Sequence, residues 1–235
     1  MKLGLQTLPW LNSIEDVQRL FSDIYNLGYE GVELAQTFET KDHRRVIDAL
    51  KRTGLKLAGI SGGALSDRLD FAISLHNKFQ DPFYLYADEW SGREHTQFKQ
   101  SGVSCSVAIH PHMFKPIQTV AEAKKVIELY PYMKFLPDTG HLTVAGENIM
   151  EVLEANFATI TAIHVKDWTP EFGRALPFYS SGFVTLGEGI VPIEEIIQYL
   201  VKVGYKGWLI VEQDFSIDPI ETARQSRIFL KKLGI

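Results

Sequence analysis

Short apolar segments and amphipathic segments alternate along the whole chain, and this alternation limits the fold more than any other feature. Eight segments have the length and apolar content of buried strands: residues 3–8, 31–34, 56–61, 83–87, 104–110, 134–138, 160–166 and 208–212. A helical pattern follows most of them. Ile193, Ile196 and Leu200, for example, recur at the spacing of one helix face. We therefore expect eight strands that alternate with eight helices.

The expected helices differ in the strength of their signals. They are predicted at about residues 13–27, 42–53, 68–79, 119–130, 147–155, 192–203 and 218–233. The first is expected to begin at Asn12 or Ser13, with Glu15 and Asp16 in its first turn, where negative charge suits the helix dipole. The remaining helix position, between residues 88 and 103, is the weakest because few large apolar residues lie there.

Strand–helix alternation of this kind requires a parallel sheet with right-handed connections. Eight units in 235 residues match one (β/α)8 barrel, whose usual length is about 250 residues. An open doubly wound sheet would need a glycine-rich phosphate turn after an early strand, and residues 59–63 do not fit that pattern. Because no Pro- or Ser-rich linker divides the chain, we expect a single domain over residues 1–235, slightly short, with a reduced fourth βα unit.

Charge and composition exclude several classes of protein. The net charge is −5 and no basic block occurs, which argues against a nucleic-acid-binding surface. No apolar run approaches the roughly 18 residues that a membrane span needs. The N-terminal segment does not resemble an export signal, and the lone Cys105 forms no internal disulfide, so a cytoplasmic protein is expected.

Ionisable residues gather at the ends of the predicted strands. These are Glu33, His110, His112, Asp138, His141, His164, Lys166, Asp167, Glu212 and Asp214. Four of the seven histidines of the chain lie there, at the ends of only three strands. In a (β/α)8 barrel the carboxyl ends of the strands converge on one site, and active sites form there.

The types of these residues suggest a metal. An isolated His or Asp at a strand end often caps a helix or satisfies a loop instead. Several buried ionisable groups from four strands need a shared purpose. Asp, His and Glu side chains without a thiolate suit one divalent ion such as Mn²⁺, Co²⁺, Mg²⁺ or Zn²⁺. A sharp turn at Gly140 is expected to bring Asp138 and His141 to one pocket.

Five motifs in order carry a resemblance to a known family. They are Gly28-Tyr-Glu-Gly-Val-Glu33-Leu34, Phe135-Leu-Pro-Asp138-Thr-Gly-His141, Ile163-His164-Val-Lys-Asp167, Leu186-Gly-Glu188-Gly and Tyr205-Lys-Gly-Trp-Leu-Ile-Val-Glu212. Together they resemble the xylose isomerase-like TIM-barrel superfamily of sugar isomerases and epimerases, which includes inosose dehydratase. The similarity covers the whole chain and is densest from His110 to Glu212.

The resemblance implies roles for individual residues. It makes Asp138, His164 and Glu212 metal ligands, with His110 in the place of the Glu that sugar epimerases of this type usually present after the fifth strand. Substrate-binding residues are expected to be Glu33, His141, Lys166 and Trp10. The segment around Glu188 is expected to be structural, because its glycines mark backbone constraint.

The reaction that the resemblance implies is isomerisation or epimerisation of a ketose or α-hydroxy ketone through a metal-stabilised enediolate, with Glu212 as the base. His110 in Ala108-Ile-His110-Pro-His112-Met113 looks closer to the His-x-His-Met of inosose dehydratases. This favours an alternative, a lyase that eliminates water from a keto-polyol, with His112 or His141 as the acid.

Two further alternatives and one partner stay open. A sugar-binding barrel without catalysis is compatible with the pattern, since fold alone does not guarantee activity. An abasic-site endonuclease of the same fold is disfavoured by the lack of His after the third and fourth strands. The substrate is expected to be a small sugar or polyol, and Arg174 is the nearest candidate for contact with a phosphate group. A homo-oligomer could supply the wall beside the short fourth unit.

Overall fold

Eight parallel strands form the centre of the computed structural model, which describes residues 1–10, 16–35, 43–75, 82–171, 182–214 and 216–235. The strands are β1 (Lys2–Gln6), β2 (Gly31–Leu34), β3 (Lys56–Ile60), β4 (Tyr84–Ala87), β5 (Ser106–Ile109), β6 (Lys134–Phe135), β7 (Ala162–Val165) and β10 (Trp208–Val211). Their order in the sheet is β6-β5-β4-β3-β2-β1-β10-β7, so each strand lies beside its sequence neighbour in the barrel. The predicted (β/α)8 barrel is confirmed.

The barrel closes between β6 and β7, where the ladder is short. Isolated parallel bridges join Phe135 to Ile160 and Asp138 to His164. The amide of His164 donates to the carbonyl of Pro137 at 2.9 Å, and the amide of Thr161 donates to the carbonyl of Phe135 at 3.1 Å. Closure therefore sets Asp138 directly opposite His164.

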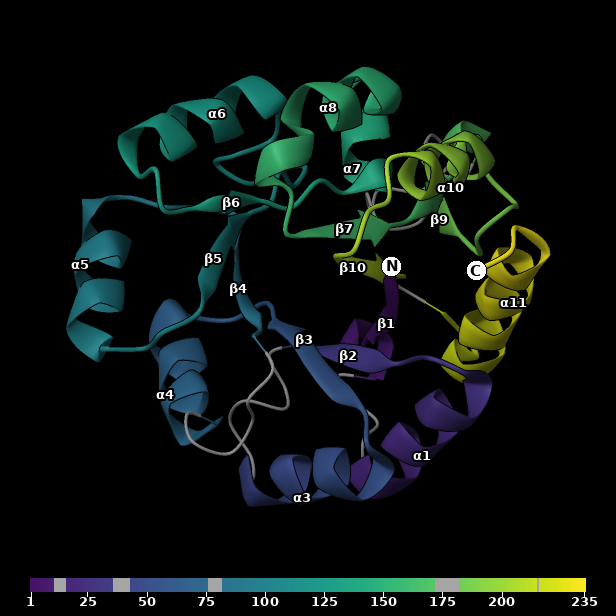
Figure 1. The fold of residues 1–235 in the computed structure, drawn as a ribbon, viewed down its shortest axis with the longest axis horizontal. Helices are drawn as coiled ribbons and strands as arrows, with labels where there is room; N and C mark the ends of the chain where they lie inside the picture. The colour runs from purple at the N-terminus through teal and green to yellow at the C-terminus, as the bar shows by residue number, and fades with distance from the viewer. Residues whose placement is uncertain (11–15, 36–42, 76–81, 172–181, 215) are drawn as a thin grey trace.

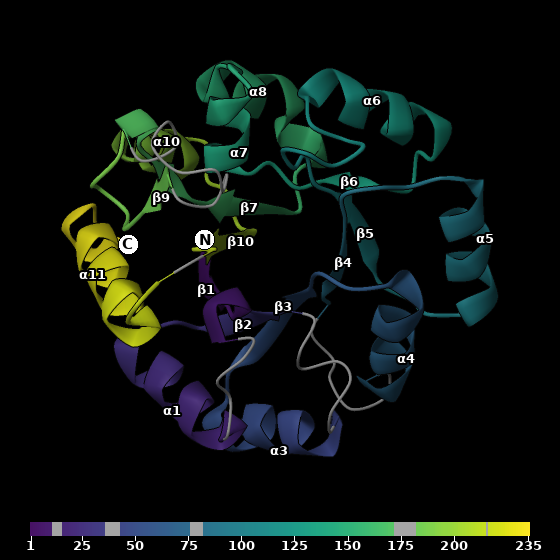
Figure 2. The ribbon, with the colours of Figure 1, turned by 180° about the vertical axis from the view of Figure 1, so that it is seen from behind.

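Helices surround the strands as a ring, which Figure 1 and Figure 2 show from the two ends of the barrel. The helices of the ring are α1 (Val17–Leu27), α3 (His43–Thr53), α4 (Leu65–Leu75), α5 (Gly92–Ser101), α6 (Val120–Leu129), α8 (Ile149–Asn156), α10 (Ile193–Lys202) and α11 (Pro219–Lys232). Each turns an apolar side to the sheet; in α10, for example, Ile193, Ile196 and Leu200 are buried. This contact between helices and sheet forms the larger hydrophobic core.

The interior of the barrel forms a second, smaller core. Its members are Ala58, Tyr84, Tyr86, Ala108, Leu136, Ala162, Trp208 and Ile210. Large and small residues complement one another here, as dense packing requires. A Cβ atom on Gly31 would lie 2.5 Å from the ring of Trp208, and one on Gly59 would overlap the ring of Tyr84. The interior is thus filled by side chains and is no open channel.

Two helices begin at residues other than the predicted ones. α1 begins at Val17 and not at Asn12 or Ser13, because the Asp16 side chain accepts from the amide of Arg19 and serves as the N-cap. Asn12, Ser13 and Glu15 lie outside the described residues. α4 begins at Leu65, three residues before the predicted start, and Leu65 is buried against the core.

The fourth βα unit is reduced in its loops and not in its helix. α5 has ten residues, as many as α6 or α10. Its sparse apolar content leaves only Phe98 buried. A capping box compensates, in which Ser91 and Glu94 each bind the other's backbone amide. Residues 88–91 and 102–105 are the short connections on either side.

Several short elements were not predicted from the sequence. η1 (Leu8–Trp10) follows β1, and η2 (Phe157–Thr159) follows α8. α7 (Thr139–Val144) begins directly after Asp138, where a sharp turn at Gly140 was expected. β8 (Asp167–Trp168) and β9 (Phe183–Val184) pair antiparallel outside the main sheet. Of these elements, α7 follows the carboxyl end of β6, and β8 follows that of β7.

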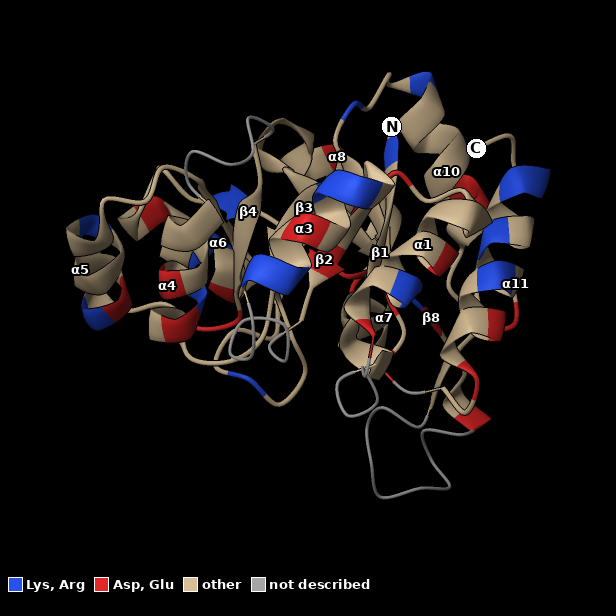
Figure 3. Cartoon of the chain, turned by 90° about the horizontal axis from the view of Figure 1, so that it is seen from below, with Lys and Arg blue, Asp and Glu red and all other residues tan. Residues whose placement is uncertain are grey.

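The outer helices of the described residues carry charge of both signs (Figure 3). Within the described residues, no helix has both the length and the apolar character needed to cross a membrane. In the side view of Figure 3, acidic and basic segments are interspersed over α3, α4 and α11.

Asp167, at the start of β8, anchors the loop that leads into α10. Its carboxylate accepts hydrogen bonds from the amides of Trp168 and Gly187 at 2.9 Å, from Gly189 at 2.9 Å and from Val191 at 3.1 Å. Only 1% of Asp167 is exposed, so these four amides depend on it in place of water. The exposed Glu188 takes no part, as expected of a structural segment in which the glycines matter.

We expect Asp167→Ala to lower the free energy of unfolding by about 3 kcal/mol, because it leaves buried amides without an acceptor. Urea unfolding followed by circular dichroism measures this loss. Glu188→Ala, in the same loop, is the matched control and should change the stability by no more than about 0.5 kcal/mol. Equal stabilities of the two variants would contradict the anchoring role.

Candidate active site

Four side chains from four adjacent positions of the barrel converge at its carboxyl end. His110 follows β5, Asp138 follows β6, His164 lies in β7 and Glu212 follows β10. All four are buried, and one ligand atom from each lies within 4.8 Å of the others. The predicted metal-binding residues are therefore brought together.

The cluster contains buried polar atoms that no protein group satisfies. Both ring nitrogens of His110, Oδ2 of Asp138, Nδ1 of His164 and Oε2 of Glu212 make no hydrogen bond of normal geometry among the described residues, and they contact mainly one another, as Nδ1 of His164 does Oε2 of Glu212 at 2.5 Å. Buried polar atoms are normally paired, so a set of orphaned atoms in one place indicates a missing ligand. Two imidazoles and two carboxylates form a donor set that suits a divalent transition ion. The residues present fit the predicted metal ion.

Glu33 orients His164 within this cluster. Nε2 of His164 lies 2.7 Å from Oε2 of Glu33, and a carboxylate can only accept, so Nε2 carries a proton. Nδ1 of the same ring then faces the cluster, 2.5 Å from Oε2 of Glu212. Glu33 is held in turn by Nε2 of Gln6 at 2.9 Å and by the hydroxyl of Tyr84. A carboxylate behind a ligating histidine commonly sets its tautomer and raises its basicity.

Negative charge dominates this end of the barrel. Four carboxylates are buried or nearly so: Glu33, Asp138, Glu212 and Asp214. Burial alone would raise the pKa of Asp138, but Lys166 and His141 outweigh it and hold that pKa well below the usual range. Burial would likewise lower the pKa of His164, yet the carboxylates of Glu33 and Glu212 raise it well above its ordinary value. The site thus attracts cations, and a divalent ion would offset the excess charge.

The two carboxylate oxygens of Asp138, which precedes the short helix α7, make different contacts. Oδ1 caps the helix by accepting from the amide of His141 at 2.7 Å. Oδ2 remains directed at the cluster, 3.5 Å from Nε2 of His110. Gly140 lets the helix approach its neighbours, because a Cβ there would lie 2.9 Å from Cγ of Lys166 and from the ring of Phe183. Asp138 and His141 do meet, through a helix turn in place of the expected sharp turn.

Lys166 lies beside the cluster in a ring of acceptors. Its Nζ is 2.8 Å from Oδ1 of Asp214, 3.1 Å from Oε1 of Glu212 and 3.2 Å from Nε2 of His141. The side chain is fully buried. Burial would lower the pKa of Lys166, but Asp138 first and then Asp214 raise it, so the ammonium stays charged.

The two other histidines predicted to act in catalysis stack on each other. The ring centroids of His112 and His141 lie 4.0 Å apart. Nδ1 of His112 lies 2.7 Å from the backbone carbonyl of Met113. The ring of Phe183, from β9, packs at 5.2 Å on His141. The two imidazoles therefore lie next to the cluster of four candidate ligands. The ring centroid of His110 is 5.7 Å from that of His141 and 5.8 Å from that of His112.

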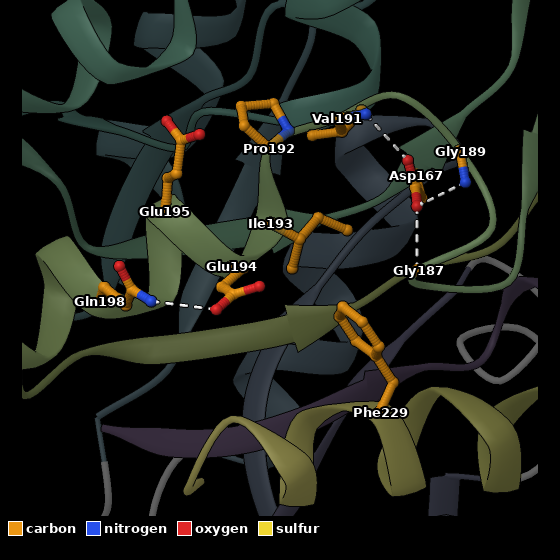
Figure 4. A pocket seen from close by; sticks show the side chains of 10 residues that line it. All are labelled: Asp167, Gly187, Gly189, Val191, Pro192, Ile193, Glu194, Glu195, Gln198 and Phe229. Atoms are coloured by element: carbon orange, nitrogen blue, oxygen red, sulfur yellow. Dashed lines mark hydrogen bonds between the residues drawn. The ribbon is translucent and has the colours of Figure 1, made fainter.

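The remaining predicted residues lie elsewhere or outside the described part of the chain. Trp10 is buried in η1 and lines a cavity of about 10 Å³ with Gln6 and Gln213, and no described contact joins it to the cluster. Arg174 lies outside the described residues. A groove of about 380 Å³ lies beside Asp167 (Figure 4), between the loop at 187–192, the start of α10 and Phe229 of α11. Its Asp167 is the loop anchor described above, so this groove is separate from the cluster.

Sequence reasoning missed two tyrosines that contact the site. Tyr84 donates to Glu33, and the ring of Tyr86 lies 4.4 Å from that of His110. Both lie on β4 and are two residues apart, which puts them on the same face of the strand. That alternation was the available signal, since one face of every barrel strand points inward.

Comparison with known proteins agrees with this geometry. Residues 95–233 match the profile of the xylose isomerase-like TIM barrel. The chain belongs to this family. The match covers more than half of the chain and includes all four residues of the cluster.

Curated relatives in the family are inosose dehydratases. One from Bacillus cereus (strain ZK / E33L), named inosose dehydratase 2, is 31% identical over 205 residues, which is 79% of this chain and 67% of the relative. An inosose dehydratase from Mesomycoplasma hyopneumoniae (strain 7448) is 27% identical, and its alignment covers 99% of this chain and 96% of the relative. That alignment spans 293 positions against 235 residues here, so the relative has segments that this chain lacks.

Solved structures share the fold at lower identity. The 3-keto-D-glucoside 4-epimerase from E. coli superimposes with a TM-score of 0.77 at 17% identity over 99% of both chains. A probable 3-DHS dehydratase from Bacillus anthracis gives a TM-score of 0.73 at 19% identity, over 98% of this chain and 99% of that one. Proteins with this fold therefore include an epimerase and a probable dehydratase.

We expect the protein to bind about one divalent ion per chain, because the four ligand atoms form one set. Isothermal titration with Mn²⁺ or Zn²⁺ measures the stoichiometry and the affinity. Asp138→Asn removes a ligand charge and should abolish measurable binding. Glu33→Gln keeps an acceptor for His164 but loses the charge, so a loss of affinity of about 10- to 100-fold is expected.

Glu154→Gln, on the exposed side of α8, is the matched control and should bind as the unaltered protein does. A wild-type chain that takes up no ion even after supplementation would contradict the metal site.

Proposed function

We propose that this chain is a divalent-metal-dependent dehydratase that removes one molecule of water from a keto sugar or keto-polyol of the inosose type. The single observation that carries the proposal is the pair of stacked histidines, His112 and His141, beside the ligand cluster. The names of the curated relatives support the same reaction. We therefore favour a lyase over an isomerase, although the sequence alone had offered the lyase as the alternative.

Glu212, the predicted base, is a less suitable proton acceptor than a histidine here. Its Oε1 forms an ion pair with Lys166 at 3.1 Å, and its Oε2 lies 2.5 Å from Nδ1 of His164. Burial would raise the pKa of Glu212, but Lys166 and His164 lower it, which makes the carboxylate a weak base. We therefore assign Glu212 to the metal ion, together with His110, Asp138 and His164.

His112 has the tautomer that a base requires. A backbone carbonyl can only accept a hydrogen bond, so the contact with Met113 O places a proton on Nδ1 of His112. Nε2 of the neutral ring then carries the lone pair. We assign to this nitrogen the removal of the proton from the carbon next to the substrate carbonyl.

The atoms and protons of the elimination are accounted for by the substrate and His112. When bound, the divalent ion would polarise the substrate carbonyl and acidify the neighbouring C–H. His112 takes the proton from this carbon and gives it to the departing hydroxyl, so water leaves as a carbon–carbon double bond forms. His141 contacts a substrate oxygen, as predicted from the resemblance.

Isomerisation or epimerisation would use the same first step and differ in the second. An isomerase returns the proton to carbon and keeps the hydroxyl. A two-base epimerase needs another proton carrier on the opposite face of the carbon. The buried carboxylates of the described residues are each bound to Lys166, His164 or a backbone amide. This engagement favours elimination over the two-base route.

Two further expectations accompany this function. The relatives process small molecules, so a sugar or polyol substrate is the expected partner. Cytoplasmic location and a homo-oligomer stay predictions.

We expect the Mn²⁺-loaded protein to convert 2-keto-inositol to a product lighter by one water, which mass spectrometry detects. His112→Gln should lower kcat by about 10²- to 10⁴-fold, because it removes the proton carrier, and should still bind the ion. Glu212→Gln should lose metal binding and activity together.

Ketohexoses and pentuloses serve as the comparison substrates in this assay. Formation of an isomer without loss of water would assign the chain to the isomerases. Full activity of His112→Gln would remove His112 as the proton acceptor.

A further inference from the structure

Lys166, Asp214 and His141 form a chain of contacts that the predicted role of Lys166 as a substrate ligand does not explain. Nζ of Lys166 lies between Oδ1 of Asp214 at 2.8 Å and Nε2 of His141 at 3.2 Å. We infer that Lys166 and Asp214 are positioning residues that fix the tautomer of His141, so that Nδ1–H of His141 is the donor offered to a substrate oxygen.

The contacts of Lys166 hold its ammonium group against atoms of the protein itself. An ammonium group has three N–H bonds and no lone pair. Asp214 and His141 accept hydrogen bonds from Nζ at 2.8 Å and 3.2 Å, and carboxylate oxygens of Glu212 and Asp138 form ion pairs with it at 3.1 Å and 3.5 Å. The side chain is fully buried, and its Nζ also lies 4.5 Å from the ring centre of Phe183. Lys166 is therefore engaged on all sides by the protein itself.

Lys166, which can only donate hydrogen bonds, determines which ring nitrogen of His141 carries the proton. Because Lys166 can only donate, Nε2 of His141 has to accept, and the proton of the neutral ring has to be on Nδ1. Burial and then the charge of Lys166 hold the pKa of His141 well below its ordinary value, in agreement with a neutral ring. A neutral imidazole free in water favours the other tautomer, so the protein imposes this one.

Nδ1 of His141 is buried and has no hydrogen-bond partner among the described residues. A buried donor without an acceptor is unfavourable, and an incoming oxygen would relieve this cost. Packing against His112 and Phe183 keeps the ring from turning this donor away. The site thus holds a prepared donor for a substrate oxygen.

The two stacked histidines then have complementary roles. His112 carries a proton on Nδ1, as its contact with Met113 O requires, and Nε2 is the nitrogen assigned above to accept the proton from carbon. His141 accepts from Lys166 at Nε2 and donates from Nδ1. One ring takes the proton from carbon while the other stabilises the oxygen on which negative charge develops. Only this last step rests on the proposed function.

The tautomer is measured directly by NMR of the ¹⁵N-histidine-labelled protein loaded with Zn²⁺, with His141→Asn used to assign the signals. We expect His141 to show a protonated Nδ1 and an unprotonated Nε2. Lys166→Met removes the donor and should shift the ring toward the Nε2-protonated form. Lys166→Arg restores a donor and should restore the Nδ1–H tautomer. Asp214→Ala, which frees Nζ, should give a mixture and serves if Lys166→Met does not fold.

Two results would overturn the inference. One is a wild-type His141 that is protonated on Nε2. The other is a tautomer that stays unchanged in folded Lys166→Met or Asp214→Ala. This measurement needs no substrate, so it stands apart from the dehydratase assay. An Nδ1–H tautomer in a protein that dehydrates no keto-polyol would support the positioning role and contradict the proposed function.

In an active protein, Lys166→Met should lower kcat by about 10²-fold with KM changed by no more than about threefold, because the lost effect belongs to the transition state. Lys166→Arg should recover most of kcat. A rise in KM with kcat unchanged would instead make Lys166 a substrate ligand and overturn the inference.

Discussion

His164 lies between two carboxylates, and the rest of the site depends on how it is held. Nε2 donates to Glu33 on one side, and Nδ1 faces Glu212 at 2.5 Å on the other. These residues come from β2, β7 and β10, so the contact ties together strands far apart in the sequence. Several buried acids in one place are stable only with compensating positive charge. Lys166 supplies part of that charge, and the geometry of the orphaned ligand atoms points to a divalent ion for the rest.

The apolar interior of the barrel supports this charged end. Tyr84 belongs to the interior core, yet its hydroxyl donates to Glu33. Its ring fits only because Gly59 opposite has no Cβ. Packing in the interior therefore sets the position of Glu33, and Glu33 sets the orientation of His164. Gly59 in β3 thus contributes to the candidate metal site without being one of its four residues.

Epimerases and dehydratases share this barrel, so the fold by itself does not choose between them. The choice depends on which group receives the proton removed next to the carbonyl and where that group returns it. In this chain a histidine, His110, follows β5, and the neighbouring His112 and His141 stack beside the ligands. Lys166 lowers the pKa of both Asp138 and Glu212 against the effect of burial, which makes these carboxylates weak bases.

Local sequence patterns were enough for the strands and for most helices. Each strand is an apolar segment bounded by polar residues, and α10 follows the helical period over its whole length. The start of α1 was misplaced because Asn12, Ser13 and Asp16 are all good N-caps, and only the folded chain shows which one binds an amide. α7 was missed because six residues give too short a pattern to detect.

The sequence by itself determined the barrel and the gathering of His110, Asp138, His164 and Glu212, because both follow from repeating strand–helix units and from residue types at strand ends. Only the tertiary structure decided what each polar atom binds. Asp167 could have been a ligand, yet it holds the amides of a loop some twenty residues further on. Lys166 was predicted to bind substrate, and the structure adds that its Nζ lies beside Asp214, Glu212 and His141. Hydrogen bonds act over about 3 Å, and which atoms come that close depends on packing between segments that no local pattern relates.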